Sequence, residues 1–154
     1  RIISKQGKLA NPADRDHCLQ YMTAVPLIFG NLTAEHYEDS FHQAHPEIDR
    51  LREKMQVIED ERYTREYLEA DKRSIANAVQ VFFSDGSSTD KIAVEYPIGH
   101  RRRREEGMPL LVEKFRANLQ TRFPAQQCDV IMDSCGSLGR LEVMPVHEFV
   151  SHLT

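Results

Sequence analysis

The spacing of the apolar residues changes twice along this chain, and these changes limit the fold more than any other feature of the sequence. Over residues 11–55 apolar side chains recur every three or four positions, which is typical of helices with one buried face. Over residues 76–96 they alternate with polar ones, as in strands, and over residues 107–153 the helical spacing returns. Because the strands follow one another without helices between them, we expect an α+β fold with a small antiparallel sheet covered by helices.

The first helix is expected to begin at Asn11 and to end at Gly30. Asn11 is a good capping residue, Pro12 suits the first turn, and Gly30 suits a helix end. Pro26 removes one helical N–H and should distort the last turn. The residues that repeat at helical spacing, and that we expect to be buried on one face, are Cys18, Met22, Val25 and Phe29.

Further along the chain, we expect an amphipathic helix over residues 46–55 with Ile48, Leu51 and Met55 facing inward. Residues 56–58 suggest a short strand, and residues 76–83 and 91–96 a half-buried hairpin around a turn at 85–88.

Three more helices are expected after the hairpin: one opened by residues 107–109, one opened by Pro124, and a short one over residues 145–153. The residues expected to face inward on the first two are Leu111, Phe115 and Leu119, and then Cys128, Ile131 and Met132.

The charge and cysteine content exclude several classes of protein. Lys and Arg number 20 against 24 Asp and Glu, a net charge of −4, which disfavours a nucleic-acid partner. No apolar run reaches the length of a membrane span, so we expect no membrane partner. The three cysteines are an odd number without C-x-x-C spacing, which disfavours a disulfide framework, a zinc ribbon or an iron–sulfur cluster.

A run of four arginines, Arg101–Arg104, follows His100 and precedes two glutamates, and it has two interpretations. Charge runs are usually solvated surface with their own counter-charges. Alternatively, the run is a cationic edge for a small polyanion, because guanidinium groups bind carboxylates in a bidentate fork. Consecutive helical residues point in different directions, so at most one or two of the arginines would face one ligand.

Two other groups of polar residues also have both a functional and a structural interpretation. His36, His42 and His45 suggest a metal site, but Pro46 biases His45 away from helical angles and the segment looks exposed, so we expect no metal. Arg15 and His17 lie at the start of the first helix, where backbone N–H groups favour anions, and Tyr21 follows one turn later. The alternative for this second group is a helix cap followed by surface charge.

Four strings in the chain carry a specific resemblance: residues 11–22, 24–30, 71–78 and 95–104. They resemble the MmgE/PrpD family, and residues 114–119 and 144–146 continue the similarity, which runs over nearly the whole chain. The resemblance implies that residues 1–154 are the C-terminal α+β lid domain of a larger two-domain enzyme, whose all-helical N-terminal domain is absent from this chain. The missing initiator Met and the strand-like residues 1–5 also favour a fragment.

The activity that the resemblance implies is a hydro-lyase of propionate catabolism, which dehydrates 2-methylcitrate to 2-methyl-cis-aconitate in the methylcitrate cycle. No cofactor and no iron–sulfur cluster would be needed. The partners would be a small tricarboxylate, the enzyme's own helical domain and a second copy in a homodimer. The location would be the cytoplasm in a bacterium or the mitochondrial matrix in a eukaryote. The fragment alone is expected to be inactive.

In the family, the acid/base residues lie largely on the helical domain, so none is placed in this chain. The residues expected to bind substrate or to face the cleft are Arg15, His17, Tyr21, His100 and Arg102. Two alternatives stay open. One is the family's cis-aconitate decarboxylase branch, which has a site tyrosine near the position of Ile3; the other is a stand-alone interaction module without catalysis.

Overall fold

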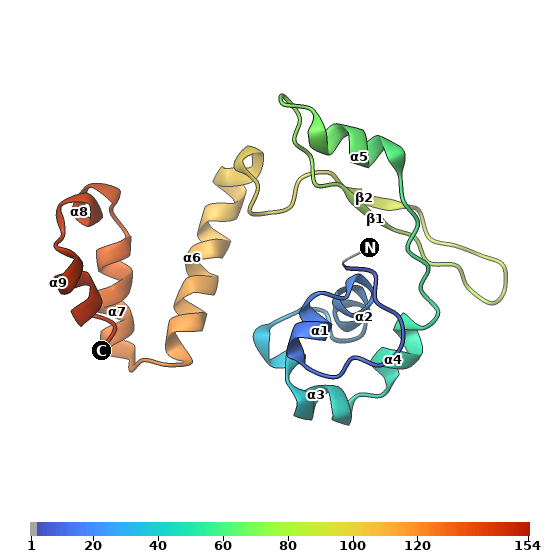
Figure 1. Cartoon of the computed structure of the whole chain (residues 1–154), viewed down its shortest axis with the longest axis horizontal. Coiled ribbons are helices and arrows are strands. Elements are labelled where there is room, and N and C mark those ends of the chain that lie inside the picture. The colour runs from blue at the N-terminus through green and yellow to red at the C-terminus, as the bar shows by residue number, and fades with distance from the viewer. Residues whose placement is uncertain (1–2) are drawn as a thin grey trace. The chain divides into compact units, whose positions relative to one another are not determined.

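The structure is a computed structural model that describes residues 3–154 and divides into two compact units (Figure 1). Unit 1 is residues 1–60 and unit 2 is residues 61–154. The elements of unit 1 are α1 (Pro12–Asp16), α2 (Leu19–Phe29), the 3-10 turn η1 (Ala34–Tyr37), α3 (Asp39–Ala44) and α4 (Glu47–Arg52). Unit 2 contains α5 (Glu61–Leu68), β1 (Asn77–Val79), β2 (Ile92–Val94), the 3-10 turn η2 (Arg101–Arg103), α6 (Arg104–Gln120), α7 (Ala125–Cys135), α8 (Leu138–Val143) and α9 (Val146–Ser151). The predicted α+β class is confirmed.

The single helix expected between Asn11 and Gly30 is two helices, because the backbone leaves the helical conformation at Cys18. Cys18 has extended angles (φ −118°, ψ 106°), and the next N–H, of Leu19, donates to the carbonyl oxygen of Ile3 at 2.7 Å. A contact with the preceding segment therefore replaces a helical hydrogen bond. Both ends are as predicted: the Asn11 side chain accepts from the Asp14 N–H at 2.9 Å, and Gly30 has a left-handed φ of 84°.

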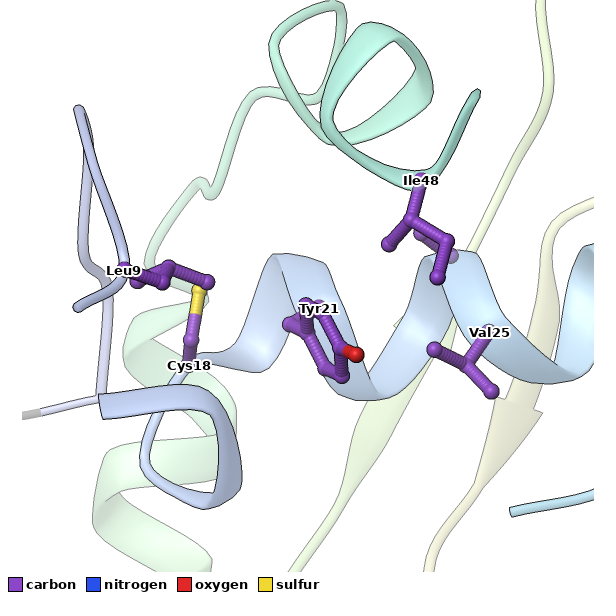
Figure 2. Packing of buried hydrophobic residues seen from close by; sticks show 6 residues of the cluster. Leu9, Cys18, Tyr21, Val25 and Ile48 are labelled. Atoms are coloured by element: carbon purple, nitrogen blue, oxygen red, sulfur yellow. The ribbon is translucent and has the colours of Figure 1, made fainter. Parts of the chain in front are cut away.

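The core of unit 1 packs α2 against α4 and the N-terminal segment (Figure 2). Figure 2 shows the side chains of Leu9 and Cys18 pointing toward one another, and Ile48 of α4 pointing toward α2 near Val25. Burial of side chains as large as Val25 and Ile48 contributes about 1.5–3 kcal/mol each. Of the predicted inward residues, Phe29, Leu51 and Met55 are only partly buried at the edge of this core, and Met22 is also only partly buried.

The strand predicted at residues 56–58 is wrong, because this segment has no ladder partner and Ile58 is 82% exposed. The helix that follows, α5, was not predicted. Half of its residues are charged, and of its apolar members Tyr67 and Leu68 are exposed and Tyr63 is half-buried. Without a buried apolar stripe, helical periodicity gives no signal.

The hairpin is confirmed but is shorter and more exposed than predicted. β1 and β2 are antiparallel with Asn77 opposite Val94 and Val79 opposite Ile92, and one further bridge follows toward the turn. The side chains of Val79, Ile92 and Val94 are 41–65% exposed. The helical cover that we expected over the sheet is therefore not made by the described part of unit 2.

Helix α6 begins three residues earlier than predicted, so that Gly107 and Pro109 lie inside it. Gly107 is buried because the helix passes close to the backbone of Ile98, where a Cβ atom would overlap the Ile98 carbonyl oxygen. Of the predicted stripe only Leu119 is buried, whereas Leu111 and Phe115 are exposed. The middle of α6 therefore presents apolar side chains that this unit does not cover.

The C-terminal helices agree with the sequence pattern except for α8. Helix α7 starts after Pro124 and buries Cys128 and Ile131 beside Leu119, as predicted. Helix α9 follows Pro145, and the Gln127 side chain donates to the carbonyl oxygen of His152 at 2.9 Å, which ties α7 to the end of the chain. Helix α8 was not predicted; its apolar residues are mostly exposed, so its sequence shows no buried stripe.

Candidate functional site

Unit 2 brings together the two strings at residues 71–78 and 95–104, which are far apart in the sequence. The pairing of β1 with β2 starts the contact, and the Ile75 N–H donates to the Glu95 carbonyl oxygen at 3.1 Å. Beyond the strands, the Arg102 guanidinium donates to the carbonyl oxygen of Asp71. The ammonium of Lys72 lies 3.2 Å from the Glu95 carboxylate. The two strings therefore form one surface at the end of the hairpin.

Two members of the arginine run hold this surface together. The Arg102 guanidinium lies over the Tyr96 ring, 5.1 Å from its centroid, in addition to its bond with Asp71. Arg103 donates to the Tyr96 carbonyl oxygen at 2.8 Å and to both carboxylate oxygens of Glu106. The hydrogen bond from Arg103 lowers the pKa of the Glu106 carboxyl. The side chains of Arg102 and Arg103 are thus used in contacts within unit 2.

The other two members of the run, Arg101 and Arg104, are exposed, and within residues 3–154 their guanidinium groups have no side-chain partner. The helix dipole disfavours cations at the start of a helix. Arg101 and Arg104, at the beginning of α6, therefore do not stabilise that helix through its dipole. A shallow hollow at this position is lined by Arg101–Arg104, Glu105, Glu106 and Met108. Arg102 and Arg103 therefore make structural contacts, and the cationic edge for a small polyanion stays a prediction, now confined to Arg101 and Arg104.

Residues 72–74 beside this surface include features that sequence reasoning missed. Lys72 is neutralised by Glu66 at 2.8 Å and by Glu95, and its hydrogen bond to Glu66 lowers the pKa of that carboxyl. Arg73 has a left-handed φ of 46°, which costs a residue with a Cβ about 1–2 kcal/mol. The buried hydroxyl of Ser74 makes no hydrogen bond within residues 3–154. No sequence pattern marks such a backbone conformation in a non-glycine residue.

The His100 ring is oriented by its neighbours. Its Nδ1 accepts a hydrogen bond from the Arg102 backbone N–H at 3.2 Å, and its centroid lies 4.7 Å from that of the Tyr96 ring. Because Nδ1 is the acceptor, the proton of the neutral ring is on Nε2. His100 and Arg102, both proposed from the sequence, therefore lie on the same surface.

Arg15 is placed differently, since it is 1% exposed and its donors bond within unit 1. Its Nε donates to the Tyr37 carbonyl oxygen at 2.7 Å, and its terminal nitrogens contact the Asp39 carboxylate and His42 Nδ1. A guanidinium only donates, so His42 Nδ1 accepts and His42 Nε2 donates to Asp49 at 3.1 Å. The Arg15 side chain ties α1 to η1 and α3.

Tyr21 and His17 differ from each other in exposure. Tyr21 is fully buried, its hydroxyl donates to the His36 carbonyl oxygen at 2.6 Å, and burial raises its pKa to about 12. The His17 side chain is 58% exposed, with Nδ1 2.5 Å from the Asp16 carboxylate. An ionised carboxylate accepts, so Nδ1 donates and Nε2 of His17 is left as an outward-facing acceptor.

The histidines that suggested a metal site have separate partners. His36 accepts from the Thr33 N–H at 2.9 Å, His42 bonds to Arg15 and Asp49, and His45 bonds to Glu47. Within residues 3–154 no three His, Cys, Asp or Glu side chains are grouped to hold a metal ion. All three cysteines are free thiols.

Residues 3–5 are not in a strand, and residues 1–2 of the expected strand end lie outside the described residues. Ile3 contributes its backbone carbonyl to the start of α2, as described above. No helix in the described part of the chain is long and apolar enough to cross a membrane.

Comparison with known proteins gives consistent matches over almost the whole chain. The MmgE/PrpD C-terminal domain family matches residues 1–138. A protein named 2-methylcitrate dehydratase from Cupriavidus necator is 56% identical over 97% of this chain, and one from Escherichia coli strain K12 is 51% identical over 97%. A protein of Yarrowia lipolytica named 2-methylcitrate dehydratase, mitochondrial, is 54% identical over 86%.

These relatives are much longer than this chain. The chain spans 31% of the length of the Cupriavidus and Escherichia proteins and 25% of that of the Yarrowia protein.

Proposed function

This chain belongs to the MmgE/PrpD family, and from that premise we propose that it is the C-terminal part of a hydro-lyase that dehydrates 2-methylcitrate to 2-methyl-cis-aconitate. The observation that carries the proposal is the identity of 51–56% with bacterial proteins named 2-methylcitrate dehydratase, over 97% of the chain. The reaction would belong to propionate catabolism. The cell compartment would follow the organism: the cytoplasm of a bacterium or, as the name of the Yarrowia relative suggests, a mitochondrion.

Dehydration of a β-hydroxy tricarboxylate makes three demands on a site. A base removes a carbon-bound proton, whose electron pair forms the double bond. The carbon–oxygen bond breaks, and the hydroxide leaves as water with a proton from an acid. Cations or N–H donors hold the carboxylates and the charge that develops beside one of them. We assign the base and the acid to the part of the enzyme outside this chain, and the third demand to this chain.

The surface of unit 2 supports that assignment. The guanidinium groups of Arg101 and Arg104 are exposed and have no partner within residues 3–154, and each can bind a carboxylate in a bidentate fork. His100 and Arg102 adjoin them, and Arg102 also holds the two strings in contact. In this proposal Arg101, Arg104 and His100 contact the substrate.

The candidates of unit 1 receive different roles in the same proposal. His17 faces the cleft with Nε2 as an acceptor, because its ring is exposed and fixed by Asp16. Arg15 and Tyr21 hold the string at residues 11–22 in shape from within the core.

The exposed apolar side chains of α6 support a partner. Met108, Leu111, Val112 and Phe115 recur at helical spacing and are 37–49% exposed. We propose that the helical domain of the full-length enzyme packs on this face and that the two domains exclude water from the substrate. A homodimer of the full-length protein and the absence of a nucleic-acid partner belong to the same proposal.

The test is an assay of the full-length protein with 2-methylcitrate, citrate and cis-aconitate in parallel. We expect the highest kcat/KM with 2-methylcitrate, with 2-methyl-cis-aconitate as product, and no turnover by residues 1–154 alone. Release of carbon dioxide from cis-aconitate, with no dehydration, would instead support the decarboxylase branch. Absence of turnover on all three substrates would overturn the proposed function.

A further inference from the structure

We propose that His100 is a fixed hydrogen-bond donor, whose Nε2–H binds a carboxylate oxygen of the tricarboxylate substrate. This inference rests on the proposed function for the identity of the ligand. The role of the ring comes from the hydrogen bonds of unit 2 alone.

The first step is the position of the ring proton. The Arg102 backbone N–H donates to Nδ1 of His100 at 3.2 Å, and a backbone N–H can only donate. The lone pair of Nδ1 is therefore used, and Nε2 carries the hydrogen of the neutral imidazole. Within residues 3–154 Nε2 has no partner, so this donor is available to a ligand.

The second step is the tautomer that this hydrogen bond requires. An imidazolium carries a hydrogen on both nitrogens. A hydrogen on Nδ1 would point at the Arg102 N–H, so the hydrogen bond that orients the ring would be lost. In this orientation His100 is therefore placed to donate a hydrogen bond from Nε2.

The third step is the rigidity of the segment that carries the ring. The Tyr96 ring lies against the His100 ring at an interplanar angle of 36°, the Tyr96 carbonyl is bound by Arg103, and the Arg102 guanidinium lies over the Tyr96 ring. The close approach of Gly107 to the Ile98 backbone fixes the other side of the segment. A donor held in this way needs little reorganisation when charge develops on the substrate.

The fourth step is the chemistry of the neighbours. Arg101 follows His100 directly and is exposed without a partner in the described chain. A guanidinium beside a neutral N–H donor suits an ionised carboxylate. When the base removes the carbon-bound proton, negative charge spreads into the adjacent carboxylate, and a fixed N–H donor stabilises that charge more than the ground state.

The kinetic test compares three variants of the full-length protein. His100→Ala removes the donor, and loss of one such donor lowers kcat by about 100-fold. His100→Gln keeps an amide N–H donor and an acceptor for the Arg102 N–H, and we expect it to recover about tenfold of that loss. His147→Gln, in the exposed helix α9, is the matched control and should leave kcat and KM unchanged. Equal kinetics in His100→Ala and the control would overturn the proposal.

The pH profile separates a fixed donor from a proton-exchanging group. A group that only donates a hydrogen bond and exchanges no proton with the substrate adds no limb to the dependence of kcat on pH, so the profile of His100→Gln should keep both limbs of the wild type. Disappearance of one limb in His100→Gln would show that His100 exchanges a proton during turnover, and would contradict the proposal.

A spectroscopic test does not depend on turnover. In full-length protein with nitrogen-labelled histidine rings, the signal missing in His100→Gln is assigned to His100. We expect its shifts to report hydrogen on Nε2 and none on Nδ1, and added tricarballylate, an unreactive tricarboxylate, to move the Nε2 signal. Hydrogen on Nδ1, or no response to tricarballylate, would overturn the inference. An inactive wild type with the expected NMR response would count against the proposed reaction and not against the donor.

Discussion

Two arginines of unit 1, Arg15 and Arg52, point inward, whereas in unit 2 the arginine run lies on the surface. Arg15 and Arg52 are 1% and 5% exposed, and each bonds a backbone carbonyl and a carboxylate of the same unit. In unit 2, Arg102 and Arg103 bond backbone carbonyls from the surface, and Arg101 and Arg104 have no partner within residues 3–154. Buried guanidinium groups stabilise one unit, and exposed ones remain available for a ligand in the other.

The two candidate histidines, His17 and His100, differ in which ring nitrogen accepts a hydrogen bond. His17 donates from Nδ1 to Asp16, which leaves Nε2 as an acceptor. His100 accepts at Nδ1 from the Arg102 N–H, which leaves Nε2 as a donor. A carboxylate partner and a backbone amide partner therefore give the same side chain opposite roles.

The largest effect is expected from Arg15→Met, which keeps the length of the side chain and removes every donor. The Asp39 carboxylate can be hydrated again, since it is 59% exposed, but the Tyr37 carbonyl and His42 lose their bonds. We expect a loss of about 3 kcal/mol, measured as faster hydrogen exchange of residues 37–52 in the full-length protein. Arg50→Met, at an exposed position of α4, is the matched control. Unchanged hydrogen exchange in Arg15→Met would show that the buried guanidinium does not stabilise unit 1.

Gly107→Ala tests whether backbone packing positions the surface of unit 2. The added Cβ would overlap the Ile98 carbonyl oxygen, so either α6 or residues 96–100 must move, at a cost of about 2 kcal/mol. Faster hydrogen exchange over residues 96–107 is the measurement. Gly139→Ala is the matched control, because a Cβ there meets nothing within 4 Å, and it should stabilise α8 by about 0.5–1 kcal/mol. Similar exchange in both variants would argue against the close approach.

The sequence was sufficient wherever a local rule and the tertiary packing agree. The Asn11 cap, the Gly30 end, the inward Ile48 and Cys128, and the presence of the hairpin are such cases. The break before α2 was not predictable, because it depends on a bond from Leu19 to the carbonyl of Ile3, a partner outside the helix. Helix α5 carries no buried apolar stripe, so the pattern that identifies helices was absent.

The candidate site was only partly predictable for a related reason. Residue types and the family strings selected His100, Arg102, Arg15 and Tyr21, but not which of them are already bonded within the fold. Four consecutive arginines are chemically identical in the sequence. Only the positions of Asp71, Tyr96 and Glu106 distinguish Arg102 and Arg103 from Arg101 and Arg104, which have no side-chain partner in the described part of the chain. The hydrogen-bond partners of each arginine can be identified only from the tertiary structure.

Tyr21→Phe tests a smaller part of the unit 1 network, since it removes only the hydroxyl bond to the His36 carbonyl. The expected cost at neutral pH is about 1 kcal/mol, measured by thermal unfolding. Burial raises the pKa of Tyr21 from 10.0 to about 12, so its hydroxyl favours folding below pH 10. That contribution is lost as the pH rises from 10 toward 12, and the loss should be smaller in Tyr21→Phe. An equal alkaline loss in Tyr21→Phe and in the exposed Tyr67→Phe control would contradict the assignment.

The smallest effect is expected from Arg116→Gln. Its ion pair with Asp129, at 2.7 Å, is formed between side chains that are 46% and 65% exposed. Exposed pairs contribute about 0–1 kcal/mol, and salt screens them. Thermal unfolding at low and high salt should therefore differ little between this variant and the wild type. A loss as large as that of Arg15→Met would show that exposure does not separate the two classes of arginine.

The most direct test of the division between the two units is the KM of the Arg101→Gln/Arg104→Gln double variant for 2-methylcitrate in the full-length protein. Each charge-assisted bond to a carboxylate contributes about 1.5–3 kcal/mol, so we expect KM to rise by at least about 100-fold with an unchanged melting temperature. The Arg122→Gln/Arg140→Gln double variant makes the same change in net charge elsewhere in unit 2 and should keep the wild-type KM. An unchanged KM in Arg101→Gln/Arg104→Gln, or an equal rise in both double variants, would contradict the assignment of the exposed arginines to substrate binding.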